Sequence, residues 1–229
     1  MKKRIFIAIQ YLEIGGAERS LIGLLNAFDY TRYEVDLFVY DHRGEFISLI
    51  PKAVRLLPER KEYAAINRSI KEIVQEGQIG VALARILAKI DYAIYHRIHR
   101  PKEGSGIFQY VADWVTPVLP SLKEYGTYDL AISFLTPHNI VRDKVLAKRK
   151  YAWIHTDYST ISVNAKKELP VWNSFDRIMA VSEGVKTTFL QLFPSLEGKV
   201  EVMENILSPT FVREQADLQD VSAEMPAIE

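Results

Sequence analysis

The stretch RIFIAIQYLEIGGAERSLIGLLNAF (residues 4–28) decides the fold class. It opens with an almost unbroken apolar run, passes through Gly15 and Gly16, and continues as a helical pattern from residue 17. A continuous apolar run of this length is typical of a parallel strand that is buried on both faces of a sheet. The stretch therefore predicts the first strand and the first crossover helix of an α/β protein.

The same alternation of apolar runs and helical patterns continues to about residue 205. It predicts right-handed crossovers and a Rossmann-like, doubly wound, mainly parallel sheet. Residues 60–127 are too long for a simple crossover, and we interpret them as an inserted helical hairpin. The further strands are expected at 33–40, 53–58, 128–134, 149–155, 176–182 and 199–205. The helices are expected at 17–28, 64–100 in one or two pieces, 138–147 and 183–193.

Composition narrows the class of protein. The 229 residues carry 29 basic and 29 acidic side chains, so the chain lacks the net positive charge expected of a nucleic-acid-binding protein. It contains no cysteine, which excludes disulfides and thiolate metal sites and fits a reducing compartment. No stretch reaches the roughly 18 apolar residues of a membrane span. We expect a soluble, cytoplasmic protein.

A glycine pair follows the first strand. Gly15 and Gly16 let the backbone approach a phosphate or a sugar at the carboxyl edge of the sheet, near the start of a helix. For a glycine pair on its own, a tight strand-to-helix turn is the better interpretation. The dinucleotide fingerprint G-x-G-x-x-G is absent, because the next glycine is Gly23 on the helix. This argues against an NAD enzyme.

A histidine and an aspartate follow the fifth strand, in the sequence WIHTD (residues 153–157). The imidazole of His155 can donate to a hydroxyl or a phosphate at the same edge. Asp157 can orient that ring or accept a hydrogen bond from a sugar hydroxyl. A histidine that merely closes the end of a strand is an equally good interpretation.

Three polar residues follow the last two strands. Ser182 is a natural N-cap, and Glu183 suits the positive end of the helix dipole, so capping alone explains both. Asn205 ends the last strand. No D-x-D triplet occurs in the chain, which fits a site without a metal.

Four motifs in this order resemble the N-terminal domain of family-four glycosyltransferases. They are GGAE after the first strand, WIHTD, DRIMAVSEGVKTTF and KVEVMENIL. These retaining enzymes have the GT-B architecture of two facing Rossmann-like domains. The resemblance covers about residues 4–208. The chain departs from the usual exit, Asn-Pro/Gly-Ile/Val-Asp, since it reads Asn205-Ile-Leu-Ser and lacks the aspartate.

The resemblance implies a role for each candidate residue. Gly15 and Gly16 match the loop that faces the donor phosphates, and His155 matches the histidine near the transferred sugar, with Asp157 beside it. By the same comparison, the segment after the sixth strand corresponds to Ser182 and Glu183, and the crossover to the second domain begins at Asn205.

The resemblance also implies that this chain is one half of an enzyme. Residues 1–208 are expected to form the acceptor-side domain, with the helical insert at about 60–127, and residues 209–229 a connector to a C-terminal donor-binding domain. The full-length protein would transfer a sugar from a nucleotide sugar to a glycan or lipid-linked acceptor, in surface polysaccharide synthesis. It would need no cofactor and no metal, and this chain alone would be inactive. The alternatives are a nucleotide-sugar 2-epimerase of the same fold and a non-catalytic binding domain.

Two surfaces are candidates for association. Residues 81–102 form a basic amphipathic pattern that suits either packing on the domain or peripheral contact with an anionic membrane on the cytoplasmic face. The loops 11–16, 156–175 and 182–184 are expected to expose an apolar patch and to favour a weak homodimer. The expected patch consists of Tyr11, Leu12, Ile14, Tyr158, Ile161, Val163, Leu169, Val171 and Trp172.

Overall fold

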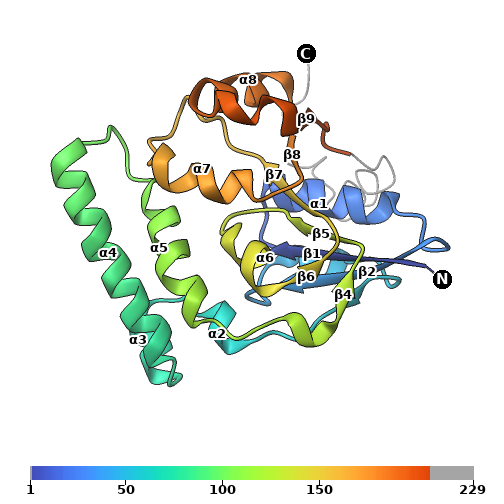
Figure 1. The fold of residues 1–229 in the computed structure, drawn as a ribbon. Helices are drawn as coiled ribbons and strands as arrows, with labels where there is room; N and C mark the ends of the chain where they lie inside the picture. Colours follow the sequence, from blue (N-terminus) through green and yellow to red (C-terminus); the bar gives the residue numbers. More distant parts are fainter. Residues whose placement is uncertain (1, 207–229) are drawn as a thin grey trace, which may run out of the picture.

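A seven-stranded parallel sheet forms the centre of the computed structural model, which describes residues 2–206 (Figure 1). The strand order is β3-β2-β1-β5-β7-β8-β9, and every neighbouring pair is parallel. The chain winds from β1 to one edge and then from β5 to the other, which confirms the predicted doubly wound fold. The strands are β1 (Lys3–Ile9), β2 (Tyr33–Val39), β3 (Arg55–Leu56), β5 (Leu130–Ser133), β7 (Lys150–Ile154), β8 (Arg177–Ala180) and β9 (Val200–Val202).

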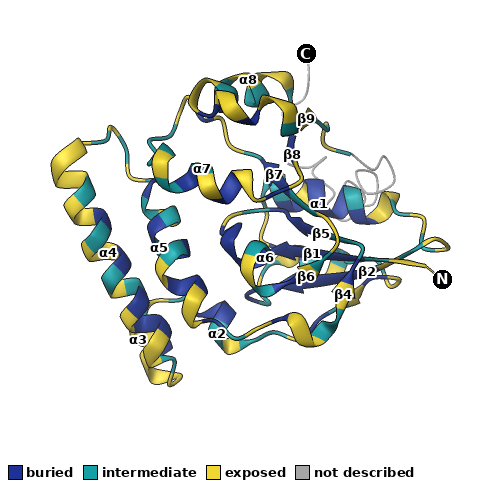
Figure 2. Ribbon diagram, viewed as in Figure 1, coloured by how far each residue is buried: buried dark blue, intermediate teal, exposed yellow. Residues whose placement is uncertain are grey.

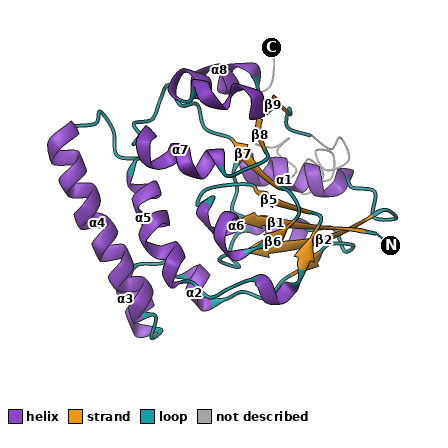
Figure 3. Cartoon of the chain, in the orientation of Figure 1, coloured by secondary structure: helices purple, strands orange, loops and turns teal. Residues whose placement is uncertain are grey.

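Helices cover both faces of this sheet (Figure 3). One face packs against α1 and the short 3-10 helix η1 (Glu45–Leu49). The opposite face packs against residues of the remaining α-helices. The helices are α1 (Gly16–Ala27), α2 (Lys61–Ala64), α3 (Ile70–Gln75), α4 (Ile79–His99), α5 (Ile107–Val115), α6 (Asn139–Lys144), α7 (Ala165–Asn173) and α8 (Glu183–Leu192). Three further 3-10 helices are η2 (Thr116–Val118), η3 (Lys123–Tyr125) and η4 (Pro194–Lys199).

The central strand β1 shows why the apolar runs are continuous. Ile5, Ile7 and Ile9 point to the α1 face, whereas Phe6 and Ala8 point to the other face. All five side chains are buried. Because both faces of the strand are covered, no position in it needs a polar side chain.

The segment between β3 and β4 is mostly helical. Ser69 begins α3 with a capping box, since its hydroxyl accepts from the Glu72 amide and the Glu72 carboxylate accepts from the Ser69 amide. Helix α4 then runs along the outer edge of the molecule and packs on α5 (Figure 1). Its buried side includes Ala88 and Tyr92, and the Tyr92 ring meets Tyr110 of α5 edge-to-face at 5.3 Å.

The structure corrects several local predictions. Residues 156–175, expected as loops, contain α7, and α5 lies within the expected helical insert but beyond the helix expected at 64–100. The helix expected at 138–147 ends at Lys144, and residues 146–147 instead form β6 (Leu146–Ala147), which pairs with β4 (Thr127–Tyr128) in a second, two-stranded sheet. Two-residue strands are too short to show any periodicity. Helix α7 contains Pro170, a residue that normally indicates the end of a helix.

The end of the described chain crosses α1 at a glycine. A Cβ atom on Gly23 would lie 1.8 Å from the backbone oxygen of Ile206, so only glycine fits there. Next to this crossing, the Ser20 hydroxyl donates to Oδ1 of Asn205 at 2.6 Å. Asn205 therefore attaches the last segment to α1. The predicted connector at 209–229 lies outside the described residues.

Candidate functional site

The predicted site residues lie at one edge of the sheet. Gly15 and Gly16 follow β1, His155 follows β7 and Ser182 follows β8. Since these strands are parallel members of one sheet, their carboxyl ends meet at the same edge, where ligands bind in doubly wound folds. The structure thus places the two motifs, Gly15–Gly16 and His155, on the same side, as the sequence predicts.

The glycine loop is partly occupied by a carboxylate. A Cβ atom on Gly15 would lie 2.2 Å from Oε2 of Glu18, whereas Gly16 faces open space. Glu18 is buried, and this burial raises the pKa of its carboxyl group. No described cation forms an ion pair with it. A phosphate bound at Gly15 would therefore stand next to an acidic group.

His155 has one ring nitrogen without a partner. Its Nε2 is buried and makes no hydrogen bond within the described part of the chain. Burial lowers the pKa of His155 to about 4, and a hydrogen bond with the backbone of Phe134 offsets this in part. Because that bond favours the protonated ring, the ring is its donor, and Nε2 is then the nitrogen without a proton. At neutral pH, His155 offers a hydrogen-bond acceptor to a ligand hydroxyl.

A cavity of about 250 Å³ lies beside His155. Apolar side chains form most of its wall, among them Phe108 of α5 and Trp172 of α7. The polar part of the wall contains Glu168, whose Oε2 accepts from Tyr158 at 2.9 Å and from Trp172 at 3.2 Å. Burial raises the pKa of Glu168. The cavity is mainly apolar with a few fixed polar groups, as is usual for a small-molecule site.

His138 is a second histidine of this wall, which the sequence analysis did not identify. Its Nδ1 lies 2.7 Å from the Ser133 hydroxyl, and its ring lies 4.4 Å from that of Trp172. Burial lowers the pKa of His138 to about 3, with a smaller contribution from His155. Both histidines are therefore uncharged at neutral pH. A site with uncharged imidazoles suits hydroxyl groups better than an isolated anion.

Asp157 makes no hydrogen bond with His155 among the described residues, and its orienting of that ring stays a prediction. Its Oδ1 accepts from the Ser159 backbone amide at 2.9 Å, and the side chain is exposed. This local hydrogen bond closes a turn. Together with hydrogen bonds from the side chains of Ser159 and Thr188, it lowers the pKa of Asp157. Contact of Asp157 with a sugar hydroxyl stays a prediction.

The residues after β8 are helix caps in the structure. The Ser182 hydroxyl accepts from the Val185 amide at 3.2 Å, which confirms the predicted N-cap. Glu183 is exposed in the first turn of α8. Substrate binding by Ser182, Glu183 and Asn205 stays a prediction, as does the absence of a metal. Among residues 2–206, no three His, Asp or Glu side chains gather in a way that could hold a metal ion.

The predicted apolar patch on the loops is wrong. Leu12, Tyr158, Val171 and Trp172 are buried, and Ile161, Val163 and Leu169 pack against the same core. The aromatic rings close this region themselves, since Phe189 of α8 lies 5.1 Å from both Tyr158 and Trp172. Of the predicted set, Ile14 is the large aliphatic side chain that stands clearly exposed.

The exposed apolar surface lies on α4 instead. Six aliphatic side chains on its outer side are between 42% and 68% exposed (Figure 2). They recur at intervals of three or four residues and therefore form one stripe along the helix. No helix of the described chain is both long and apolar enough to cross a bilayer. We name this stripe the α4 face; it consists of Ile79, Leu83, Ile86, Ile90, Ile94 and Ile98.

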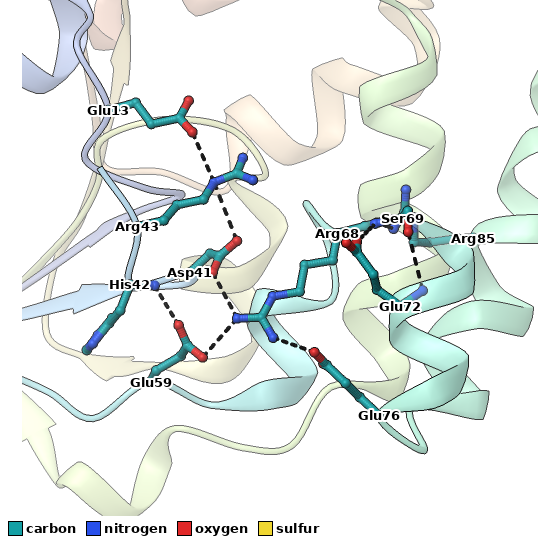
Figure 4. A network of polar contacts seen from close by, with 10 residues as sticks. All are labelled: Glu13, Asp41, His42, Arg43, Glu59, Arg68, Ser69, Glu72, Glu76 and Arg85. Atoms are coloured by element: carbon teal, nitrogen blue, oxygen red, sulfur yellow. Dashed lines mark hydrogen bonds and ion pairs between the residues drawn. The ribbon is translucent and has the colours of Figure 1, made fainter. Parts of the chain in front are cut away.

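A cluster of paired charges, separate from the cavity, lies beyond the end of β2. The guanidinium of Arg68 contacts Asp41 at 3.0 Å, Glu59 at 3.1 Å and Glu76 at 2.8 Å (Figure 4). Asp41 is also 3.5 Å from Arg43. Each carboxylate of this Arg68 cluster has a cation within the chain. The cluster is therefore a structural element that joins β2 to the helices of the insert.

The overall fold is similar to that of solved glycosyltransferase structures. The chain matches a glycosyltransferase from Rickettsia africae ESF-5 with a TM-score of 0.50 and 12% identity, over 99% of this chain and 50% of that chain. The chain has a Rossmann-like fold of the GT-B type. Anabaena Alr3699/HepE in complex with UDP and glucose gives a TM-score of 0.49 and 15% identity, over 94% of this chain and 50% of that one.

This GT-B-type domain spans about half the length of the structures it matches. The complex of Alr3699/HepE with UDP-glucose gives a TM-score of 0.47 and 14% identity over 94% of this chain. No protein-family model matches the chain, and no curated protein matches it at a significant level. At these identities the likeness shows the fold, and the activity must be argued from the site.

Proposed function

We propose that this domain is the acceptor-side half of a retaining, family-four glycosyltransferase that uses a nucleotide sugar. The observation that carries the proposal is the cavity beside His155, at the edge of the sheet where doubly wound folds bind ligands. A buried ring nitrogen without a partner costs free energy, and a ligand hydroxyl can recover it. The GT-B-type fold and the four sequence motifs support the same class of enzyme.

The proposed reaction is transfer on the front face of the sugar. The bond from the anomeric carbon to the diphosphate breaks, and a bond to the acceptor oxygen forms on the same side. The proton of the acceptor hydroxyl passes to the leaving diphosphate, while His155 holds a hydroxyl of the sugar or the acceptor. We assign stabilisation of the leaving diphosphate to a second, donor-binding domain, and this chain alone would then bind donors weakly.

Sugar transfer by the full-length protein tests this function. We expect transfer from a UDP- or GDP-sugar, and we expect His155→Ala to lower turnover about 100-fold, since loss of one preorganised hydrogen-bonding group at a reacting centre costs that much or more. His96→Ala is the matched control, because that imidazole is exposed on α4 and lines neither cavity, and turnover should change less than about threefold. Normal turnover by His155→Ala would leave His155 with a structural role. Conversion of the free nucleotide sugar to its 2-epimer would favour the alternative that the protein is a nucleotide-sugar 2-epimerase. Binding of the nucleotide sugar without either reaction would favour a non-catalytic binding domain.

We also propose that the α4 face rests on an anionic membrane, on which a lipid-linked acceptor would be presented. Lys89, Arg97, Arg100 and Lys102 lie on or beside this helix as exposed cations. The nearby acid Asp91 is already bonded to Trp114 at 3.1 Å and lies 3.5 Å from Lys167. An aliphatic stripe bordered by uncompensated cations suits a surface of anionic headgroups.

Vesicle binding tests the membrane contact. The chain should sediment with vesicles that contain phosphatidylglycerol, and Ile90→Ser with Ile94→Ser should weaken this binding about tenfold through lost apolar burial. Leu192→Ser is the control, because Leu192 is an exposed leucine on α8. A second copy of the chain is the competing occupant. Dimerisation without lipid that persists at high salt and disappears in the double variant would show that the face is a dimer interface.

A further inference from the structure

A second cavity lies on the inner side of α4 and contains cations. Its volume is about 180 Å³, and it shares Phe108, Ala112, Thr136 and Pro137 with the cavity beside His155. Its polar lining consists of Gln10, Asn67, Arg85, Lys89 and Thr136, with no acidic side chain among the lining residues. The two cavities are therefore neighbours across one wall, and only this one has a positive lining.

Arg85 carries a charge that the chain does not neutralise. Its Nη1 donates to the backbone oxygens of Ala65, at 3.0 Å, and of Arg68. It contacts no carboxylate among residues 2–206, whereas the neighbouring Arg68 contacts three (Figure 4). Burial lowers the pKa of Arg85, yet a guanidinium stays protonated at neutral pH. A half-buried cation without a counter-ion lowers the stability of the fold, and a bound anion would offset that loss.

The groups left without partners here are all hydrogen-bond donors. Nε of Arg85 and Nδ2 of Asn67 are buried and make no hydrogen bond in the described part of the chain. Lys89, one turn after Arg85 and so on the same side of α4, forms no ion pair with a described residue. Arginine, lysine and an amide nitrogen together fit a group with several acceptor oxygens and a negative charge, which is the chemistry of a phosphate.

The position of the cavity indicates which phosphate it would bind. On one side it adjoins the His155 cavity, and on the other Lys89 lies three residues after Ile86 of the α4 face and therefore beside it on the helix. A molecule with a sugar, a phosphate and an apolar chain would meet these three regions in that order. We propose that the Arg85–Lys89 cavity binds the phosphate of a lipid-linked acceptor, an inference that rests on the proposed glycosyltransferase function. The acceptor is then a glycosyl phosphate or diphosphate with an apolar tail.

Direct binding to the chain tests this assignment without any sugar transfer. Calorimetry with geranyl diphosphate, which has the anion and a short apolar tail, should show binding. Lys89→Gln should weaken it about tenfold, because a charge-assisted hydrogen bond is lost. Lys71→Gln is the matched control, since it removes the same charge from an exposed position of α3, outside both the cavity and the α4 face. The control should stay within about twofold. Equal losses in the two variants, or none in Lys89→Gln, would overturn the proposal.

Further probes separate the sources of the phosphate. Geraniol, which lacks the anion, should bind equally weakly to the wild type and to Lys89→Gln. Inorganic pyrophosphate should bind more weakly than geranyl diphosphate but with the same dependence on Lys89. Vesicle binding that depends on Lys89, together with geranyl diphosphate binding that does not, would assign the cavity to membrane headgroups and overturn the acceptor assignment.

Arg85 itself needs a check on folding, because it also holds two backbone oxygens. Arg85→Gln should weaken geranyl diphosphate about tenfold in a chain whose circular dichroism is unchanged. If that variant does not fold, Lys89→Gln decides. Absence of sugar transfer in the full-length protein would refute the function but not the cavity, whereas transfer with unaffected diphosphate binding in both variants would refute the cavity alone.

Discussion

Two arginines on either side of α3 have opposite surroundings. Arg68 contacts three carboxylates, and one of them, Asp41, is almost fully buried. Arg85 contacts backbone oxygens only, and a cavity lies beside it. The contrast teaches that a charge matched within the chain holds the fold together, whereas a charge left unmatched at a cavity is available to a ligand. The predictions for Arg68 and Arg85 test this comparison directly, and those for His138 and Glu18 extend it to other buried titratable groups.

The largest effect is expected at the matched arginine. Arg68→Met should lower the free energy of unfolding by about 3 kcal/mol, since it leaves Asp41 buried with Arg43 alone and frees two more carboxylates. Urea unfolding followed by circular dichroism measures this loss.

A surface ion pair provides the control for Arg68. Arg177 contacts Glu201 at 2.7 Å, and both side chains are about half exposed. Arg177→Met should therefore cost less than about 1 kcal/mol. Similar losses in the two variants would mean that the Arg68 cluster contributes no more than a solvated pair.

The uncharged histidines of the cavity should make stability depend on pH. Burial lowers the pKa of His138 to about 3, from an ordinary value of 6.5. Between these values the unfolded chain binds a proton that the folded chain does not, so stability falls as the pH drops from 6.5 toward 3. One proton corresponds to about 1.4 kcal/mol per pH unit. His138→Gln should therefore reduce the slope of the unfolding free energy against pH by up to about 1.4 kcal/mol per pH unit. Urea unfolding between pH 7 and 5 measures this slope.

The control for His138 is His96→Gln, a change at an exposed position of α4. It should leave the pH dependence as it is in the wild type. An unchanged slope in His138→Gln would show that this histidine already binds its proton in the folded chain, and the cavity would then be charged.

A smaller effect is expected at the unmatched arginine. Arg85→Met should lower the free energy of unfolding by about 1 kcal/mol, because two backbone oxygens lose a donor but no carboxylate is left without a cation. The measurement is the same urea titration as for Arg68. A loss as large as that of Arg68→Met would remove the distinction between the two arginines.

The smallest change is expected at Glu18, a buried carboxylate without a described cation. Glu18→Gln should alter the free energy of unfolding by less than about 0.5 kcal/mol, since an amide of the same shape replaces an acid whose pKa burial already raises. In the full-length protein it should raise nucleotide affinity about threefold, by removing a negative charge beside Gly15. Glu13→Gln, at an exposed residue paired with Arg43, is the control. Weaker nucleotide binding would show that Glu18 contacts the ligand directly.

The fold could be predicted because its strands are buried on both faces. Residues 5–9 have to be apolar throughout, and that requirement is visible in the sequence. The capping role of Ser182 was equally visible, because an N-cap acts on amides of its own helix. Helix α7 was not, since Pro170 argues against a helix and its stability comes from Trp172 packing on His138 and Phe189.

The candidate site was predictable only where it follows a strand. His155 could be placed at the carboxyl edge because it ends β7, but its partner at Phe134 belongs to another strand end. Arg85 illustrates the limit more sharply. Its charge is visible in the sequence, and its helix could be predicted. Whether a carboxylate from β2 or the insert reaches it depends on tertiary packing. The error about the apolar patch has the same origin, because sequence does not show which aromatic rings meet.

Gly23 has a consequence for recognising related proteins. A glycine inside a helix is normally counted as a loss of about 1 kcal/mol relative to alanine. At this position it makes room for the backbone of Ile206, whose oxygen would lie 1.8 Å from a Cβ atom. At identities as low as the 12% shared with the Rickettsia africae glycosyltransferase, a glycine that only makes room for the backbone can be a better signature than the residues of the cavity. We expect a glycine here wherever the last strand exits across the first helix in this way, however far the cavity residues have changed.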